Sequence, residues 1–168
     1  SAASVIAQTV RSAVGADAAL LDGKAAAAPL YEGDYTESDL NAAIADENLY
    51  AGELTGAQMQ AIFNDVIWAT TTYQYHTIEP LVDYPALAGM KARLSSDGRQ
   101  SLLLLPDGTG LDPAATYTVV ISQNVLSALS YLQNENVNRF VPLGATLQST
   151  FRDQLATGRH PDLDHAGW

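Results

Sequence analysis

The chain has 168 residues, a net charge of −11 and a total of eight lysine and arginine residues. This acidity argues against nucleic acid as a partner, because nucleic-acid binding draws most of its affinity from basic side chains that release counterions. The absence of cysteine excludes disulfides, thiolate metal ligands and a cysteine nucleophile.

Hydrophobic periodicity predicts helices and strands that alternate along the chain. The expected helices cover residues 2–14, 37–45, 55–70, 123–133 and 146–157. The expected strands cover residues 17–21, 48–53, 89–95, 101–105 and 116–122. No repeat or linker divides this series, so we expect one domain over residues 1–158 and a tail with little periodicity over residues 159–168. No apolar run reaches the roughly 20 residues that a membrane-spanning helix needs.

The start of the helix predicted at residue 55 is the clearest local signal. Thr55 is the expected N-cap, and Gln58 three residues later completes a capping box. Apolar residues then recur at helical spacing: Met59, Ile62, Phe63, Val66 and Ile67. They form one stripe, which predicts a helix with a single face packed on a core.

The strands differ in their expected burial. Residues 116–122 alternate and have one distinctly apolar face, and residues 89–95 alternate with one wet face. Residues 102–105 are all leucine, so we expect this strand to be buried on both faces. Such a strand predicts an interior sheet layer.

Two motifs carry a family resemblance. Residues 52–59 read Gly-Glu-Leu-Thr-Gly-Ala-Gln-Met, and residues 110–119 read Gly-Leu-Asp-Pro-Ala-Ala-Thr-Tyr-Thr-Val. With the shorter segments at 15–21, 32–40 and 88–93, they resemble in order the C-terminal domain of the 5'-nucleotidase and UDP-sugar hydrolase family. The resemblance covers residues 1 to about 125. It implies an α/β (α+β) fold of four layers, an α/β/β/α sandwich; the sequence alone would also allow a three-layer sandwich.

Members of that family are two-domain phosphoesterases, in which an N-terminal domain holds two metal ions that activate water. This chain has three histidines and none of the family's metal-ligand motifs. The resemblance therefore implies no catalytic residue, metal or cofactor here. It places the divalent metal pair in an N-terminal metallophosphoesterase domain of the same polypeptide. We expect the isolated chain to be inactive.

The resemblance assigns this domain to substrate recognition, but all three recognition elements depart from the pattern. The family's arginine loop reads Asp-Gly-Lys-Ala here, with Lys24 as its cation. The loop therefore lacks the guanidinium group that can bind a phosphate or carboxylate through two hydrogen bonds. Residues 44–48 lack the phenylalanine that stacks on the base. Residues 127–134 lack the glycines of the closing loop, and Tyr131 could replace the second ring. The candidate substrate-binding residues are Lys24, Arg93 and Tyr131.

Each candidate also has a structural interpretation. Lys24 fits a solvated loop lysine, and Tyr131 fits a helix-face aromatic residue beside leucines at helical spacing. Arg93, with Lys91 and Arg99, could hold an anion or form a solvated strand face.

Three further clusters raise similar alternatives. Residues 73–76 with Trp68 could line a nucleoside or carbohydrate cleft, or cap the core. The histidines and aspartates of residues 160–165 could hold a metal ion, although a terminal tail rarely preorganises one. Residues 107–112 resemble a calcium loop superficially and fit a turn better.

Two functions remain open. The chain is expected to be the substrate-specificity domain of a secreted or periplasmic 5'-nucleotidase-like metallophosphoesterase, with an altered site for a nucleotide or another phosphorylated metabolite. The alternative is a non-catalytic binding or structural module derived from that family. The sequence opens directly into a helical pattern without a signal peptide, which suggests a segment of a longer protein.

Overall fold

The computed structural model describes residues 2–27, 36–71, 80–98 and 100–157. The α-helices are α1 (Ala2–Val14), α2 (Glu37–Ala43), α3 (Gly56–Ala69), α4 (Gln123–Tyr131) and α5 (Leu147–Ala156), and the short 3-10 helices are η1 (Gly23–Ala25) and η2 (Glu135–Arg139). The strands are β1 (Ala18–Leu21), β2 (Asn48–Thr55), β3 (Ala86–Ala88), β4 (Lys91–Leu94), β5 (Ser101–Leu104), β6 (Thr116–Ser122) and β7 (Val141–Thr146). The tail predicted at 159–168 lies outside the described residues.

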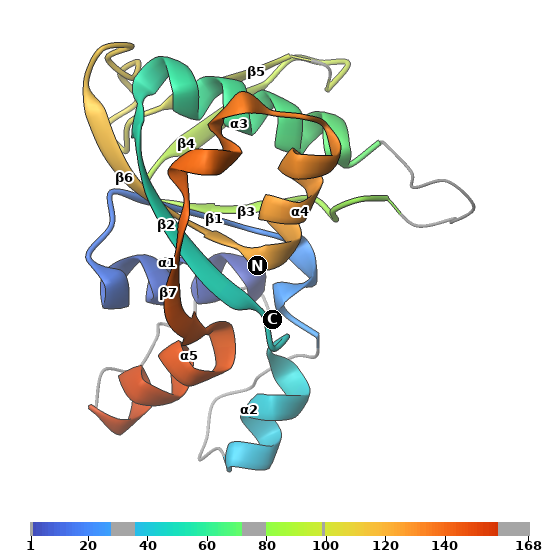
Figure 1. The fold of residues 1–168 in the computed structure, drawn as a ribbon, viewed down its shortest axis with the longest axis vertical. Coiled ribbons are helices and arrows are strands. Elements are labelled where there is room, and N and C mark those ends of the chain that lie inside the picture. Colours follow the sequence, from blue (N-terminus) through green and yellow to red (C-terminus); the bar gives the residue numbers. More distant parts are fainter. Residues whose placement is uncertain (1, 28–35, 72–79, 99, 158–168) are drawn as a thin grey trace.

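The strands form two sheets (Figure 1). The larger sheet has five strands in the order β3-β1-β6-β2-β7, and β4 and β5 form a separate hairpin. β1 and β6 are parallel neighbours, whereas β2 runs antiparallel to both β6 and β7. The end of β1 and the end of β6 therefore meet at one edge of the sheet, beside the start of β2.

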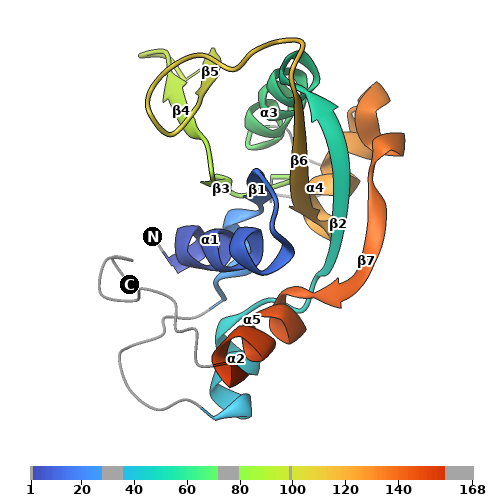
Figure 2. The ribbon, with the colours of Figure 1, turned by 90° about the vertical axis from the view of Figure 1, so that its left-hand side faces the viewer.

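Helices cover both faces of the larger sheet. α1, α2 and α5 pack on one face, and α3 and α4 pack on the other. In Figure 1 the first group lies in the lower half of the view and the second in the upper half, and Figure 2 gives the perpendicular view. Successive residues of β1 enter opposite cores, Ala19 and Leu21 on the α1 side and Ala18 and Leu20 on the α3 side. The predicted mixed α/β fold is confirmed.

The second sheet is held against α3 by Gln60 and Asn64, and Asn64 Oδ1 accepts the Ser101 hydroxyl at 2.7 Å. The Gln60 side chain accepts the backbone N–H of Leu103 at 2.8 Å and donates to the carbonyl oxygen of Ser101 at 3.1 Å. This contact uses both ends of the amide. It fixes β5 beside the helix through groups that the hairpin's own pairing leaves free.

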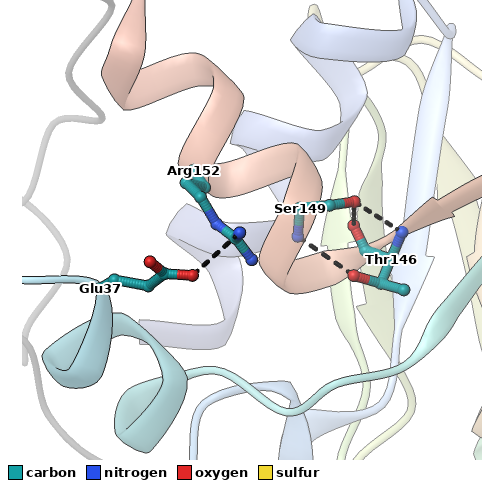
Figure 3. Close-up of polar contacts among 4 residues, drawn as sticks. All are labelled: Glu37, Thr146, Ser149 and Arg152. Atoms are coloured by element: carbon teal, nitrogen blue, oxygen red, sulfur yellow. Dashed lines mark hydrogen bonds and ion pairs between the residues drawn. The ribbon is translucent and has the colours of Figure 1, made fainter.

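Capping boxes begin three of the helices. The box predicted for α3 is present, with the Gln58 N–H donating to Thr55 Oγ1 and Gln58 Oε1 accepting the Thr55 N–H. Figure 3 shows the same arrangement at the start of α5, between Thr146 and Ser149. Each box satisfies helix N–H groups that have no partner within the helix.

α5 also secures α2, which leads into the second strand. The Gln148 side chain donates to the carbonyl oxygen of Ile44 at 2.8 Å, where α2 ends. Near the start of α2, Arg152 pairs with Glu37 at 3.0 Å (Figure 3). That pair is largely exposed and contributes little stability. The glutamine contact is the more important one, because it satisfies a carbonyl at a helix end.

The prediction that residues 102–105 are buried on both faces is wrong. Leu102 is 49% exposed and Leu103 only 1%. β5 pairs with a single strand and packs one face on α3, so its neighbouring leucines alternate between core and solvent. The strands buried on both faces are β1 and the second half of β6. β4 also differs from expectation, because Ala92 is exposed together with Lys91 and Arg93.

We predict that Leu103→Ala lowers the free energy of unfolding by about 2–5 kcal/mol, because it leaves a cavity between β5 and α3. The matched control Leu102→Ala should cost less than about 1 kcal/mol, since that side chain is half in water. Urea unfolding of both variants measures the difference. Equal losses would contradict the one-sided packing of the hairpin.

Candidate functional site

The candidate site lies where β1 and β6 end side by side. In open α/β sheets, ligands bind outside the carboxyl ends of the strands. Here Asp22 directly follows β1, Asn124 stands in the first turn of α4 after β6, and Glu47 directly precedes β2. Chain topology thus brings three polar residues from distant parts of the sequence to one edge of the sheet.

Asp22 connects three segments at this edge. Its side chain is fully buried. Oδ1 accepts the backbone N–H groups of Lys24 and Asp83, each at 3.0 Å, and Oδ2 accepts Asn124 Nδ2 at 3.3 Å. One carboxylate therefore fixes the turn after β1, the segment before β3 and the start of α4.

The close approach between the first two of these segments requires a glycine. A Cβ on Gly23 would lie 2.4 Å from the carbonyl oxygen of Tyr84, well inside contact distance. Only a residue without a side chain lets the 83–84 segment lie against the turn. Gly23 thereby allows Asp22 to reach the Asp83 N–H.

Glu47 caps α4 from outside the helix. Ser122, the N-cap residue, makes no capping hydrogen bond, and Glu47 Oε1 instead accepts the Asn124 N–H at 2.9 Å. An anion at a helix N-terminus is favoured by the free N–H groups and by the helix dipole. The second oxygen, Oε2, and the Ser122 hydroxyl are both buried.

Burial dominates the electrostatics of both carboxyls. Burial raises the pKa of Asp22, while the N–H groups of Lys24 and Asp83 oppose the rise. Burial also raises the pKa of Glu47; the Asn124 N–H opposes this rise, and the negative charge of Asp22 adds to it. Asp22 and Glu47 thus form an acidic floor at this edge of the sheet, and burial makes the ionisation of both carboxyls unfavourable.

Exposed polar and aromatic side chains around the acidic floor form a polar rim. Asn48 donates to Gln123 across the start of β2 and the start of α4 at 3.0 Å, and both side chains are exposed. Lys24 is partly exposed in η1, and Tyr84 is 62% exposed. An amide pair, an ammonium group and an aromatic ring are thus the groups that a ligand at this edge would meet.

The three predicted site residues stand on three separate elements. Lys24 lies at the candidate site, next to Asp22. Tyr131 is 52% exposed and ends α4, about 10 Å along the helix from Asn124. Arg93 is exposed on β4, opposite Leu102 of the hairpin. The structure thus places Lys24 at the strand ends and the other two elsewhere.

Sequence reasoning missed Asp22, Glu47 and Asn124 as members of one site. Asp22 and Glu47 stand within the two segments where this chain departs from the family's arginine loop and phenylalanine, so the signal was present as a deviation. Their contact through Asn124 depends on the strand order, which no local pattern contains.

The remaining sequence candidates have mixed outcomes. Residues 107–112 form a turn, as expected, in which Asp107 accepts the N–H and hydroxyl of Thr109. Residues 73–76, Arg99 and the cluster at 160–165 lie outside the described residues. Within the described part of the chain, no group of three or more His, Asp or Glu side chains could hold a metal ion.

An open hollow of about 540 Å³ lies at the opposite end of the sheet. Its lining comes from β2, β6, η2 and β7, and includes Glu53, Thr118 and Arg139. A Cβ on Gly52 would lie 2.6 Å from the carbonyl oxygen of Arg139, so this glycine lets η2 approach β2. Lys24, Arg93 and Tyr131 do not line the hollow.

Comparison with known families agrees with this fold. The model of the 5'-nucleotidase C-terminal domain matches residues 1–130. The chain therefore belongs to the 5'-nucleotidase C-terminal domain family. No curated protein matches the sequence. None of the helices in the described residues is long and apolar enough to cross a membrane.

Solved structures show the same fold at low sequence identity. A 5'-nucleotidase precursor from Thermus thermophilus has a TM-score of 0.71 and 17% identity, and the match covers 94% of this chain and 32% of that one. An NAD nucleotidase from Haemophilus influenzae has a TM-score of 0.69 and 14% identity, covering 95% and 31%. A putative 5'-nucleotidase from Staphylococcus aureus has a TM-score of 0.55 and 12% identity, covering 83% and 34%. The chain thus spans about a third of each of these proteins.

We predict that Asp22→Ala destabilises the domain by about 2–4 kcal/mol, because it removes a buried carboxylate that accepts two backbone N–H groups and the Asn124 amide. Asp46→Ala is the matched control: it removes an exposed carboxylate one residue before Glu47 and should change stability by less than about 0.5 kcal/mol. Chemical unfolding measures both values. If the two variants lose the same stability, Asp22 does not connect the three segments.

Proposed function

We propose that this chain is the substrate-specificity domain of a secreted or periplasmic 5'-nucleotidase-like metallophosphoesterase and that its ligand site is altered. Membership of the family supports the first part. The observation that carries the second part is the acidic floor formed by Asp22 and Glu47 beneath a single lysine, at the carboxyl ends of β1 and β6.

The catalytic step belongs, in this proposal, to an N-terminal metallophosphoesterase domain of the same polypeptide. That domain would hold the divalent metal pair that activates water for attack on phosphorus. The length of the structural relatives, about three times the matched segment, supports a larger protein of this kind. The role of the present domain is then to bind the part of the substrate that does not react.

The proposed alteration of the site determines which residues would contact the ligand. Lys24 offers one compact charge instead of a planar guanidinium, and the buried Asp22 carboxylate next to it opposes a dianionic phosphate. We therefore propose that Lys24 makes a single contact with a nucleotide or other phosphorylated metabolite. Tyr131 and Arg93 are proposed as further contacts, to be reached by a ligand or by another part of the protein that extends beyond the strand ends.

A second candidate is a non-catalytic binding or structural module derived from the same family. One observation favours it. α4 is a continuous helix where the family resemblance expects a glycine loop, and Leu129 on that helix is fully buried. In this case the ancestral nucleoside pocket is filled, and the domain presents a surface rather than a ligand site.

We predict that the purified 168-residue chain does not hydrolyse a chromogenic phosphate ester with or without added divalent metal. The measurement is product release over hours at several chain concentrations. Hydrolysis that rises with chain concentration and disappears with a chelator would contradict a purely binding role.

We also predict that a phosphorylated ligand raises the melting temperature of the chain. A ligand at 100 times its dissociation constant stabilises by about 2.7 kcal/mol, so a screen of nucleosides, nucleotides and UDP-sugars can detect binding. Lys24→Ala should weaken a phosphorylated ligand about tenfold or more, whereas Arg152→Ala, which removes an equal charge on α5, should not. Absence of any shift would favour the structural module.

A further inference from the structure

Asp22 and Glu47 are two buried carboxyls, and Lys24 is a cation that acts on the first of them. Asp22 is fully buried and Glu47 is 8% exposed. Lys24 acts electrostatically on Asp22, and Asp22 acts on Glu47 with the same sign of charge. Burying two anions beside one cation leaves a net negative charge in a region of low dielectric, which is strongly unfavourable.

The two carboxyls accept different numbers of hydrogen bonds. Asp22 accepts from three donors, which use both of its oxygens. Glu47 accepts one backbone N–H, through Oε1. The Ser122 hydroxyl is fully buried and interacts with the Glu47 carboxyl, where it opposes the rise in the pKa of Glu47. Asp22, with three donors, is therefore better supported as an anion than Glu47.

We propose that Glu47 is a neutral carboxylic acid at pH 7, in which Oε1 caps α4 and the proton on Oε2 is donated to the Ser122 hydroxyl, while Asp22 remains the anion of the pair. A single proton removes the excess negative charge of the buried pair. The hydrogen bond between Glu47 and Ser122 is kept, because the serine hydroxyl can accept from the neutral acid as well as donate to the anion.

A bound cation is the competing explanation, and the structure favours the proton. The free oxygens available to a cation are Glu47 Oε2 and Ser122 Oγ, beside an Asp22 Oδ2 that already accepts from Asn124. Hard cations take six or more oxygen ligands, far more than this cluster offers. The N-terminus of α4 also presents positive partial charge at this point, which repels a cation.

Among the residues that the structure describes, the groups around Glu47 form other contacts. The Leu147 N–H of α5 donates to the backbone carbonyl of Glu47, and the Asn48 and Gln123 side chains bond to each other. Asp46 is an exposed neighbour in the chain, and Asp83 contributes its N–H to Asp22.

The proposal predicts a characteristic pH dependence. Burial raises the pKa of Glu47 in the folded state, so the folded chain holds a proton that the unfolded chain releases. Stability from this group is fully present below the unfolded pKa and is lost as pH rises toward the folded one. Above the folded pKa the loss stays constant.

The test is Glu47→Gln, because glutamine reproduces both the acceptor and the donor of the neutral acid. Urea unfolding of the native chain and the variant should agree near pH 4. Between pH 5 and 7 the folded-to-unfolded ratio of the native chain should fall about tenfold per pH unit relative to the variant, the slope for one proton. Asp46→Asn is the matched control and should show no such relative slope.

One outcome overturns the proposal: the difference in the free energy of unfolding between the native chain and Glu47→Gln stops changing with pH below pH 6. That result would mean that Glu47 is ionised at pH 7. Stabilisation of the native chain by sodium, potassium or magnesium chloride, but not by tetramethylammonium chloride, would assign the site to a cation and also overturn it. If the variant does not fold, infrared spectra of the native chain decide: a protonated carboxyl band should persist at pH 7, and its absence refutes the proposal.

Discussion

The fold depends on one constraint, the burial of β1 and β6 on both faces while they run parallel to each other. Each strand sends alternate side chains into two separate cores, so helices must cover both faces of the sheet. The parallel ends must also be closed, because strand ends and helix starts expose unpaired backbone groups. Asp22 and Glu47 close them, and the polar site follows from the same constraint that makes the core.

The candidate site combines the family fold with carboxyls that bind the chain's own backbone. The layers and strand order resemble those of much longer nucleotidases at 14 to 17% identity. At the strand ends the carboxyls of Asp22 and Glu47 bind the chain's own backbone. The acidic floor stabilises the edge of the sheet, and the exposed rim above it is left to determine what is bound.

Interactions between residues close together in the chain allowed several helices and strands to be predicted from the sequence. The Thr55–Gln58 capping box and the apolar stripe behind it predicted α3 almost to the residue. β7 was not predicted, because Pro142 and Gly144 interrupt its pattern and it pairs with only β2. β3 was missed because three residues are too short for a periodic signal. Lys24 lies just after β1, and its role as a substrate contact stays a prediction, whereas Glu47 and Asn124 were not recognised as members of this site.

The sequence by itself determined the family, most of the helices and strands, and the absence of arginine from residues 22–29, because these depend on residues close together in the chain. The tertiary structure alone decided which strands are interior. Four consecutive leucines at 102–105 are as apolar as any buried strand, yet the hairpin has one neighbour and leaves Leu102 half in water. It also decided that Asp22, Glu47 and Ser122 share one buried edge, because their proximity arises from strand order, which local periodicity does not encode.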